Sequence, residues 1–371
     1  MTAGPESPIR VAVLADTVTG RAGMGRYARE VLRGLARRED VALVPIVPRV
    51  AAGAIEALDL ARPVLDQIEV PGRTRVEQGL WERYRLGTVL ERHPVDVVHG
   101  IKHIVPRTNR PTVLTVHDLV TLTWPQQADL VRRLLLPRQY RASLRSAQVL
   151  VTYSEATRRR LADFDPALGA KAVTAPIGFT PELLSADPLP VPDLVGRTFA
   201  LVVGDLSPRK NIGFLVELWP EIFAATGGLL LAVVGPDGAR SRSTRHRVAE
   251  LVEAGMAVRP GRVAEGALRW CYEHARVVLL PTLEEGFGLP VLEAAVFQVP
   301  VVANPEPALV EVGQGWPTFV DLNDRARWIE AIVETSPTGE TRHSPLTAWP
   351  TWDEHVSGLV GAYRLAIRAT T

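Results

Sequence analysis

Short runs of consecutive apolar residues recur along the chain, each bounded by polar residues, proline or glycine. Continuous apolar runs of this length are typical of strands that are buried on both faces of a parallel sheet. We expect such strands in the first half at residues 10–16, 95–99, 112–116 and 148–152, and in the second half at residues 199–205, 229–234, 277–280 and 300–303.

Between these runs lie stretches in which apolar residues recur at helical spacing. Residues 26–38 place Tyr27, Val31, Leu32 and Leu35 on one helical face. Residues 211–223, 264–275 and 352–369 show similar patterns. Strands that alternate with helices predict an α/β fold with parallel sheets.

Three prolines at alternate positions, Pro188, Pro190 and Pro192, separate the two halves. Proline lacks a backbone N–H and fixes φ, so this segment cannot be helical and is typical of an extended linker. We predict a Rossmann-like domain at residues 1–187, a second one at residues 188–350, and a C-terminal helix at residues 351–371.

The composition excludes several classes of protein. Of 371 residues, 46% are hydrophobic and 22% are charged, which excludes wholesale disorder. The net charge of +1 is far less basic than is usual for a dedicated nucleic-acid-binding protein. The single cysteine, Cys271, excludes an intramolecular disulfide and a cysteine-built zinc site, and is typical of a reducing compartment.

No apolar stretch approaches the ~20 residues that a membrane-spanning helix needs, so we expect a cytoplasmic protein. The first 190 residues hold 26 basic and 20 acidic side chains, and the basic excess gathers at Arg132–Arg145 and Arg158–Arg160. Solvated helix faces are the favoured interpretation of these arginines. A basic surface for an anionic acceptor, or for peripheral contact with the inner membrane face, remains the alternative.

Ligands of open parallel sheets bind at the carboxyl ends of the strands, so the segment after each strand is a candidate site. After the first strand, glycines at 20, 23 and 25 precede a helix, and glycine allows a backbone to approach a ligand closely. After the strand at 112–116 comes His117-Asp118, where the histidine either points toward a ligand or bonds the backbone of its own loop.

Arg209 and Lys210 follow the first strand of the second half, just before a helix. Cations at a helix N-terminus are the reverse of what the helix dipole favours, so the pair indicates a bound anion, most simply a phosphate. A solvated loop pair is the alternative.

The segment from Pro281 to Ala294 is the most specific in the sequence, with a strand end, a glycine-rich turn and a helix that starts near Pro290. Glu285 and Glu293 lie eight residues apart on either side of the turn. Two carboxylates can accept hydrogen bonds from two sets of sugar hydroxyls, and backbone amides of the turn can hold oxygen atoms.

These strings resemble the large retaining glycosyltransferase family 4, which has the GT-B fold. The match includes the E-x7-E pattern from Glu285 to Glu293, the loop from Gly204 to Asn211 with its P-R-K-N variant, and the G-x-G-R-Y turn at residues 23–27. Residues 116–118 and 153–157 also match family positions, in the same order along the chain. The resemblance implies two Rossmann-like β/α/β domains that face each other across a cleft, with the C-terminal helix returning toward the first.

The resemblance also implies roles. Arg209 and Lys210 would neutralise the donor diphosphate, Glu293 would accept from the nucleotide ribose, and Glu285 would hold hydroxyls of the transferred sugar. His117 would contact the donor sugar, and Gly25 would bring its amide to the diphosphate. The implied catalytic set is His117, Glu285, Arg209 and Lys210; the donor-binding set is Gly25, Gly204, Arg209, Lys210, Glu285, Gly286, Phe287, Gly288, Leu289 and Glu293; the acceptor-binding set is Asp118, Arg26 and Tyr27.

The implied activity is the transfer of a hexose of the mannose, rhamnose, glucose or GlcNAc type from a UDP, GDP or dTDP sugar. The acceptor is a sugar, a lipid-linked glycan or a small metabolite, and no cofactor or metal is required. Cations and oriented amides ease departure of the leaving group, and a front-face substitution retains the configuration. The string Asp163-Phe164-Asp165 is a literal D-x-D metal motif, but it lies in a polar helical stretch, and we interpret it as coincidence.

Two departures from the family pattern are visible. Asp205 stands where many members have an arginine, and residues 304–311 replace the usual small, serine-rich turn before a Pro-Glu pair. Two other functions stay open: a nucleotide-sugar 2-epimerase on the same fold, and a non-catalytic sugar-binding homologue.

Overall fold

The computed structural model describes residues 7–370 except 21–22, 65, 73, 125–129, 180, 239 and 336–348. The chain forms two compact units. Unit 1 comprises Met1–Leu119, Leu134–Gly178 and Pro350–Thr371, and unit 2 comprises Val120–Arg133 and Phe179–Trp349. The predicted domain limits at residues 187 and 350 stay predictions.

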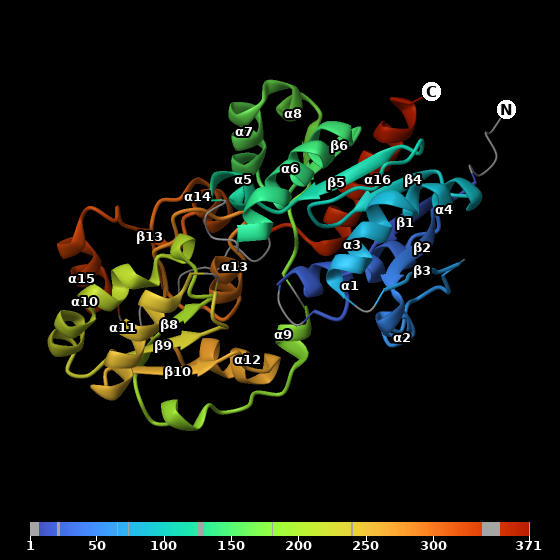
Figure 1. Ribbon diagram of the computed structural model, residues 1–371. Helices are drawn as coiled ribbons and strands as arrows, with labels where there is room; N and C mark the ends of the chain where they lie inside the picture. The colour runs from blue at the N-terminus through green and yellow to red at the C-terminus, as the bar shows by residue number, and fades with distance from the viewer. Residues whose placement is uncertain are drawn as a thin grey trace. The chain divides into compact units, whose positions relative to one another are not determined.

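Unit 1 contains a seven-stranded parallel sheet in the order β3-β2-β1-β4-β5-β6-β7 (Figure 1). Its strands are β1 (Ile9–Leu14), β2 (Val41–Pro48), β3 (Ile68–Val70), β4 (Val97–Gly100), β5 (Thr112–Val116), β6 (Val149–Thr152) and β7 (Ala172–Thr174). Alternate residues of β1 and β2, such as Ala12, Leu14, Val44 and Ile46, enter one apolar cluster, because successive side chains of a strand point to opposite faces.

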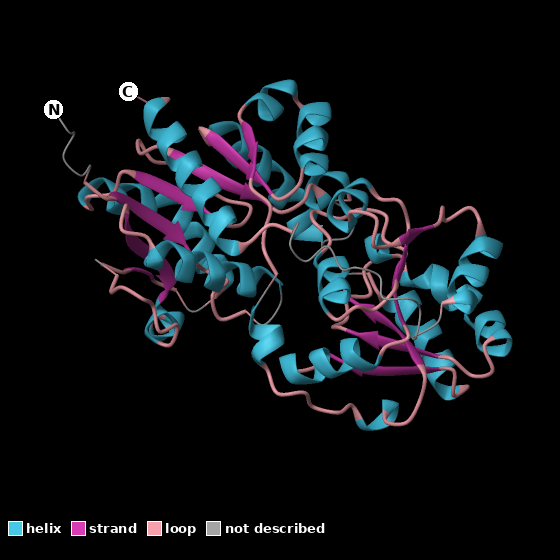
Figure 2. Cartoon of the chain, turned by 180° about the vertical axis from the view of Figure 1, so that it is seen from behind, coloured by secondary structure: helices cyan, strands magenta, loops and turns pink. Residues whose placement is uncertain are grey.

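The helices of unit 1 flank the strands (Figure 2). They are α1 (Gly23–Arg37), α2 (Gly53–Glu56), α3 (Arg75–Tyr84), α4 (Leu86–Arg92), α7 (Glu155–Phe164), α8 (Pro166–Ala170) and α16 (Trp352–Arg368), together with α6 (Leu130–Ser146) from Leu134 onward. The 3₁₀ turn η1 (Arg49–Ala51) follows β2.

Helix α16 packs against elements from the first half of the chain, namely α1, β5 and β6 (Figure 1). Its N-terminus has a capping box, in which Thr351 accepts from the amide of Glu354 and the Glu354 carboxylate accepts from the amide of Thr351. The predicted helix at 352–369 and its return to the first half are confirmed.

Unit 2 contains a six-stranded parallel sheet in the order β10-β9-β8-β11-β12-β13. Its strands are β8 (Phe199–Val203), β9 (Leu230–Val234), β10 (Ala257–Gly261), β11 (Val277–Leu280), β12 (Val301–Ala303) and β13 (Thr318–Phe319). Alternate residues of β8, β9 and β11 pack against Trp219 and Trp328, which are fully buried.

The helices of unit 2 are α5 (Val120–Thr123), α9 (Pro181–Ser185), α10 (Ile212–Ala225), α11 (Arg242–Glu253), α12 (Glu265–His274), α13 (Leu289–Val296), α14 (Pro307–Gly313) and α15 (Arg325–Glu334), with 3₁₀ turns η3 (Pro192–Leu194) and η4 (Pro208–Lys210). None of the described helices is both long and apolar enough to span a membrane.

The strand predictions at 112–116 and 277–280 match the structure residue for residue, and the other predicted strands differ by one to two residues at their ends. Strand β2 was not predicted. It contains Pro45, whose missing N–H is a signal against a strand inside a sheet, yet β2 pairs with both β1 and β3. The proline-rich linker is confirmed as non-helical at residues 186–191, but Pro192, also predicted to be non-helical, begins the 3₁₀ turn η3.

A chain of buried hydrogen bonds ties α16 to the sheet of unit 1. It passes through Tyr363, His99, Thr115, Tyr27, His355 and the carbonyl of Ala175, with distances between 2.8 and 3.1 Å. A carbonyl can only accept, so Nδ1 of His355 donates to it and Nε2 accepts from Tyr27. Each hydroxyl and each neutral imidazole has one proton to donate, so the remaining donors follow in turn. Thr115 donates to Tyr27, Nε2 of His99 donates to Thr115, and the hydroxyl of Tyr363 donates to Nδ1 of His99.

The two histidines in this series of hydrogen bonds, His99 and His355, are neutral at pH 7. Burial lowers the pKa of His355 to about 4, although the hydrogen bond to Ala175 opposes the shift. Burial also lowers the pKa of His99 to about 3, and the neighbouring imidazoles of His355 and His117 lower it further. In the unfolded chain both groups regain their ordinary pKa of 6.5.

The stability of unit 1 should therefore fall as the pH drops from 6.5 toward 4, because the unfolded chain binds protons that the folded chain excludes. Each such histidine contributes a slope of up to ~1.4 kcal/mol per pH unit. Urea denaturation at a series of pH values measures this slope, and His355→Gln should reduce it by about one proton.

His246→Gln is the matched control, because the side chain of His246 is 77% exposed on α11. It should leave the slope unchanged. A slope that is identical in the wild type and in His355→Gln would contradict the assignment of a neutral, buried His355.

Candidate functional site

The loop after β8 begins with a close approach between two backbones. Gly204 has φ of +149°, and a Cβ on it would lie 3.3 Å from Cε of Lys210. A Cβ on Gly235, at the end of the adjacent β9, would lie 1.9 Å from the carbonyl oxygen of Gly204. Glycine is therefore required at 235 by contact alone, and at 204 by backbone conformation.

The same loop turns sharply toward α10. Asp205 accepts from the hydroxyl of Ser207 at 2.5 Å, and the turn η4 then presents Arg209 and Lys210. Asn211 has φ of +52°, which separates η4 from the start of α10. The two cations thus lie in the turn before the helix rather than in its first turn.

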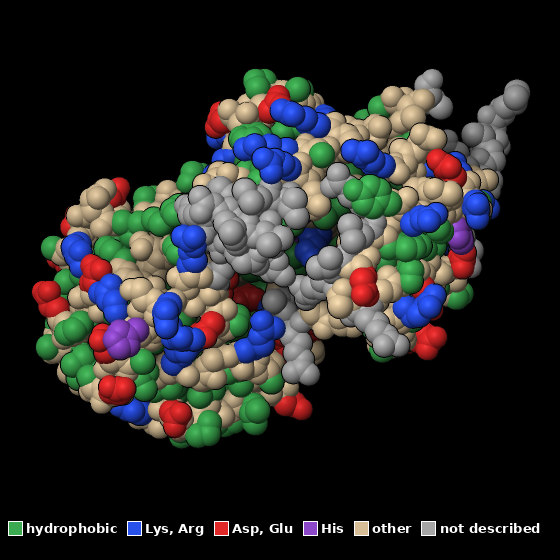
Figure 3. All heavy atoms as spheres, viewed as in Figure 1, with side chains coloured by type: hydrophobic (Ala, Val, Ile, Leu, Met, Phe, Trp, Pro, Cys, Tyr) green, Lys and Arg blue, Asp and Glu red, His purple; other side chains and the backbone are tan. Residues whose placement is uncertain are grey.

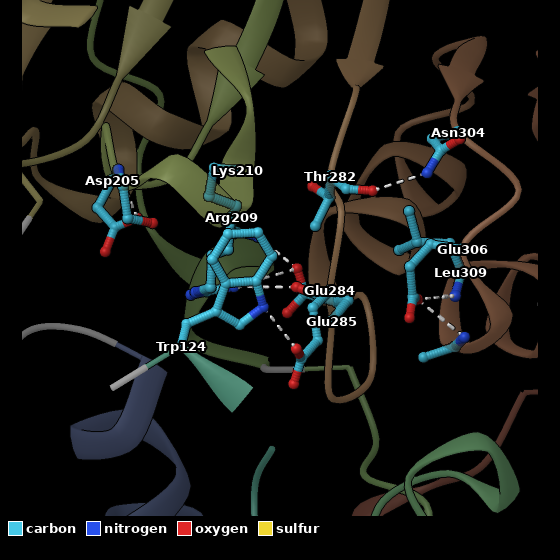
Figure 4. A network of polar contacts seen from close by, with 12 residues as sticks. Trp124, Asp205, Arg209, Lys210, Thr282, Glu284, Glu285, Asn304, Glu306 and Leu309 are labelled. Atoms are coloured by element: carbon cyan, nitrogen blue, oxygen red, sulfur yellow. Dashed lines mark hydrogen bonds and ion pairs between the residues drawn. The ribbon is translucent and has the colours of Figure 1, made fainter. Parts of the chain in front are cut away.

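Arg209 and Lys210 both face Glu285, which follows β11 (Figure 4). Lys210 forms an ion pair with Oε2 of Glu285, and Nη1 of Arg209 lies 3.8 Å from the same oxygen. The three side chains are between 10% and 19% exposed. The structure therefore brings together three predicted site residues that are up to 76 positions apart.

Glu285 is ionised in this arrangement. Burial opposes the charge, but the ammonium of Lys210 and the guanidinium of Arg209 outweigh burial and hold the pKa of Glu285 below its ordinary value. Two cations and one carboxylate leave a net charge of +1 at this point, which favours an incoming anion.

Glu284 was not predicted as a site residue. Its side chain is 7% exposed, and Oε2 accepts from the hydroxyl of Thr123 at 2.8 Å and from Nε1 of Trp124 at 2.9 Å (Figure 4). Oε1 has no partner among the described residues. Nη1 of Arg209 also donates to the backbone oxygen of Glu284 at 3.4 Å, so the two loops are joined by main chain and side chain.

These contacts place residues 120–124 in unit 2, although the preceding strand β5 belongs to unit 1. Glu284 is 160 positions from Trp124, and nothing local in the sequence marks that pair. The only signal in the sequence for a role of Glu284 was its position as a second carboxylate directly before the predicted site residue Glu285.

Glu293 lies on α13 and is 3% exposed. The hydroxyl of Tyr272, on α12, donates to its Oε2 at 2.6 Å. Gly288 immediately precedes α13 and has φ of +106°. A Cβ on Gly288 would lie 2.7 Å from the side chain of Leu309. The predicted turn and the helix start near Pro290 are confirmed, with the proline in the first turn.

The departure at residues 304–311 has a structural role. Glu306 is 2% exposed and caps α14, because its Oε2 accepts from the amides of Ala308 and Leu309 at 2.9 and 3.2 Å (Figure 4). Asn304 donates to the carbonyl of Thr282 at 3.0 Å. The segment after β12 is thereby fixed to the segment after β11.

In unit 1, Gly25 packs directly on the backbone of Gly20. A Cβ on Gly25 would lie 1.8 Å from the carbonyl oxygen of Gly20, so no other residue fits. The guanidinium of Arg29 also donates to that oxygen, at 2.8 Å. Contact within the turn therefore explains glycine at 25, and the predicted role of its amide toward a diphosphate stays a prediction.

His117 bonds through both ring nitrogens. Nε2 donates to the carbonyl of Ile101 at 2.6 Å, and Nδ1 accepts from the hydroxyl of Tyr153 at 2.8 Å. Burial lowers the pKa of His117, although the bond to Ile101 and the charge of Asp118 oppose the shift. The histidine is neutral, and its predicted contact with a donor sugar would have to replace the bond to Ile101 or use the ring face.

The predicted acceptor residues differ in exposure. Tyr27 is 3% exposed and its hydroxyl belongs to the buried chain that reaches His355, so its placement does not favour contact with an acceptor. Arg26 and Asp118 are partly exposed, and the backbone oxygen of Asp118 accepts from Tyr140 at 2.9 Å. Their predicted acceptor role stays a prediction.

The D-x-D string has a local explanation. Helix α7 ends at Phe164, and Asp165 caps α8 by accepting from the amide of Ala167 at 3.1 Å. Among the described residues, no group of three His, Cys, Asp or Glu side chains is arranged to hold a metal ion.

The basic cluster at Arg132–Arg145 falls partly outside the described side chains, since those of Arg132 and Arg133 are not described. Arg138, Arg141 and Arg145 are exposed, and Arg141 lies over the ring of Phe164. On the face shown in Figure 3, basic side chains are spread among acidic and apolar ones. Peripheral membrane contact through this region stays a prediction.

Removing one donor to Glu284 should destabilise unit 2. Trp124→Phe and Thr123→Val each delete a hydrogen bond to a buried carboxylate and should lower the free energy of unfolding by about 1.5–3 kcal/mol. Thr123→Ser, which keeps the hydroxyl, is the control and should cost less. Urea denaturation measures all three, and equal stability of the Val and Ser variants would show that the hydroxyl is not used.

Two family models match successive parts of the chain. Residues 21–182 match the model described as Glycosyltransferase Family 4, and residues 197–336 match the model described as Glycosyl transferases group 1. The first contains the segments after β1 and β5, and the second contains Arg209, Lys210, Glu285 and Glu293.

Known proteins with similar sequences or structures agree with these matches. The chain is 26% identical over 320 residues to O-antigen chain mannosyltransferase B of Escherichia coli, which covers 81% of this chain and 84% of the relative. It is 28% identical over 182 residues to D-inositol 3-phosphate glycosyltransferase of Segniliparus rotundus, which covers 45% of this chain and 39% of the relative.

Among solved structures, sucrose-phosphate synthase from Thermosynechococcus elongatus superposes with a TM-score of 0.69 at 17% identity, covering 98% of this chain and all of that one. That likeness concerns the fold. With two parallel α/β units, the paired cations and carboxylate after β8 and β11, and both family matches, the chain is a glycosyltransferase with the GT-B fold.

Proposed function

We propose that this chain is a retaining hexosyltransferase that moves a hexose from a nucleotide-diphosphate sugar to an acceptor hydroxyl without a metal ion. The observation that carries the proposal is the placement of Arg209 and Lys210 beside Glu285 at the carboxyl ends of β8 and β11. Parallel α/β sheets bind nucleotide ligands at this edge.

In the proposed donor site, Glu285 holds the two cations in place before the donor arrives. The diphosphate of the donor then takes over the charges of Arg209 and Lys210, and charge that develops on the leaving group is stabilised by groups that need no further ordering. Glu285, released from part of this pairing, can accept hydrogen bonds from hydroxyls of the transferred sugar.

The remaining donor contacts follow the family pattern. Glu293 accepts from the ribose hydroxyls, with its carboxylate oriented by Tyr272. Amides from Gly286 to Leu289 bind sugar or phosphate oxygens, and Gly204 allows the loop after β8 to approach the donor. The implied roles of Gly25 and His117, both in unit 1, toward the donor stay predictions.

The proposed sugar is mannose, because a relative that covers 81% of this chain is named a mannosyltransferase. The G-x-G-R-Y and P-R-K-N variants favour a mannosyl- or rhamnosyl-transferring branch, so rhamnose is the alternative. GDP is then the first nucleotide to test, with UDP and dTDP as alternatives. The proposed transfer retains the anomeric configuration through front-face attack of the acceptor hydroxyl as the nucleotide leaves.

The proposed function predicts the effect of removing each cation, Arg209 or Lys210. Arg209→Gln and Lys210→Gln should each lower kcat/KM by about 10²–10³-fold, because each removes a charge that stabilises the leaving diphosphate. Release of GDP from GDP-mannose, and of UDP and dTDP from their sugars, measures the rate. Arg197→Gln is the control, since Arg197 is an exposed cation of unit 2 outside the site, and it should change the rate less than twofold.

Turnover that persists in both variants would refute the proposed site. Interconversion of two nucleotide sugars without release of the nucleotide would instead favour the 2-epimerase. Binding of nucleotide sugars, seen as a raised melting temperature without turnover of any donor, would favour a non-catalytic homologue.

A second prediction concerns metal and stereochemistry. Because Arg209 and Lys210 supply the positive charge, treatment with EDTA should leave the rate of nucleotide release within about twofold. Proton NMR of the product should show the same anomeric configuration as the donor. Loss of activity that Mg²⁺ or Mn²⁺ restores, or an inverted product, would contradict the respective half of the proposal.

A further inference from the structure

A second pair of a lysine and a carboxylate lies in unit 1. Nζ of Lys102 is 3.1 Å from Oδ2 of Asp16, and the two side chains are 33% and 31% exposed. Asp16 follows β1 and Lys102 follows β4. Because β1 and β4 are parallel neighbours, paired from Val11↔Val97 to Leu14↔Gly100, both residues leave the same edge of the sheet.

The position of this pair in the topology is special. From β1 the chain moves outward to β2 and β3, and it returns to β4 on the other side of β1. The loops after β1 and β4 therefore diverge, and ligands of open α/β sheets bind where such loops diverge. In unit 2 the corresponding strands are β8 and β11, and the segments that follow them contain Lys210 and Glu285.

Two further titratable groups, Glu82 and His103, interact electrostatically with the pair. Glu82 of α3 makes no hydrogen bond or ion pair with the described residues. Burial raises the pKa of Glu82 to about 7; the charge of Asp16 adds to this rise, and the charge of Lys102 opposes it. Nδ1 of His103 is buried without a partner among the described residues. Burial lowers the pKa of His103 to about 4, with the predicted acceptor residue Asp118 opposing the shift, so the ring is neutral at pH 7.

The charges of this cluster indicate the chemistry of its ligand. Among the described residues, the ammonium of Lys102 lies against the carboxylate of Asp16, and the charges of both act on the carboxyl group of Glu82. Among the described side chains, a phosphate would meet as much negative as positive charge here. A neutral polyhydroxylated ligand can accept from Lys102 and donate to Asp16 and Glu82 at the same time.

The choice of lysine agrees with a hydroxyl ligand. The chain has 42 basic residues and only three are lysines, and Lys102 is the one that lies after a central strand of unit 1. Arginine presents a planar fork that suits bidentate anions, whereas lysine presents a compact charge with three donors that can reach single hydroxyl oxygens.

We propose that Asp16, Lys102 and Glu82 bind hydroxyl groups of a neutral saccharide acceptor, so that unit 1 selects uncharged sugar over sugar phosphate. This inference rests on the proposed function, because an acceptor exists only if the chain transfers a sugar. It assigns residues that neither the sequence motifs nor the family resemblance pointed to.

The test uses the full chain and measures nucleotide release from GDP-mannose, UDP-glucose and dTDP-rhamnose. Methyl α-mannoside and methyl α-glucoside are the neutral acceptor probes, and mannose 6-phosphate and glucose 6-phosphate are the charged ones. The neutral glycosides should raise the release rate above that with water. Asp16→Asn and Lys102→Met should raise the acceptor KM about tenfold or more, because each weakens hydrogen bonds that involve a charged group.

Lys102→Arg keeps the charge but not the shape of the ammonium, and it should also raise the acceptor KM, which separates hydroxyl binding from general electrostatics. Arg49→Met is the matched control, because Arg49 forms an exposed ion pair with Glu69 at 3.0 Å elsewhere in unit 1. It should leave the acceptor KM unchanged. Melting temperatures check that each variant is folded.

The outcomes separate the two proposals. Nucleotide release that only the sugar phosphates stimulate, that no acceptor probe stimulates, or whose acceptor KM is the same in all variants would overturn this inference and leave the proposed function standing. Absence of nucleotide release from all three donors in the wild type would overturn the proposed function, and this inference with it.

Discussion

The ion pair between Lys210 and Glu285 joins the two loops on which the candidate donor site of unit 2 is built. A buried carboxylate beside a single buried ammonium needs further hydrogen bonds to be stable, and the loops supply them: Arg209 lies against the same carboxylate and bonds the backbone of Glu284. The amide of Leu283 in turn donates to the carbonyl of Arg209 at 2.8 Å. The candidate anion site is therefore held together by contacts within the protein, and its geometry depends on both loops being held by their strands.

Much of the fold could be predicted because its signals are local. Apolar runs located eight strands, helical spacing located α16, and the proline-rich segment was found to be non-helical. Strand β2 was missed because Pro45 is a local signal against a strand, and pairing with both neighbours overrides it. The short strands β3 and β7 hold three residues each, too few for a periodic pattern to stand out.

The candidate site could be predicted only in part, for a related reason. Motifs identified Arg209, Lys210 and Glu285 as separate residues, but their mutual pairing is a contact over 75 positions that no spacing reveals. Glu284 illustrates the limit, because its donors come from residues 123 and 124, which follow a strand of the other unit. Tyr27 shows the converse: its motif suggested a ligand contact, whereas its hydroxyl completes a buried chain that includes α16.

That buried chain has a consequence for how the protein is made. Unit 1 is discontinuous, and residues 350–371 complete it after the whole of residues 179–349 has been synthesised. Until α16 emerges from the ribosome, Tyr27 and His99 lack their partners His355 and Tyr363, and the sheet of unit 1 lacks the helix that covers β5 and β6. Since domains fold as units during synthesis, unit 2 can complete its sheet while unit 1 is still waiting for its last helix. Unit 1, the first to begin translation, can thus acquire its full set of native contacts only after residues 179–349 have been translated.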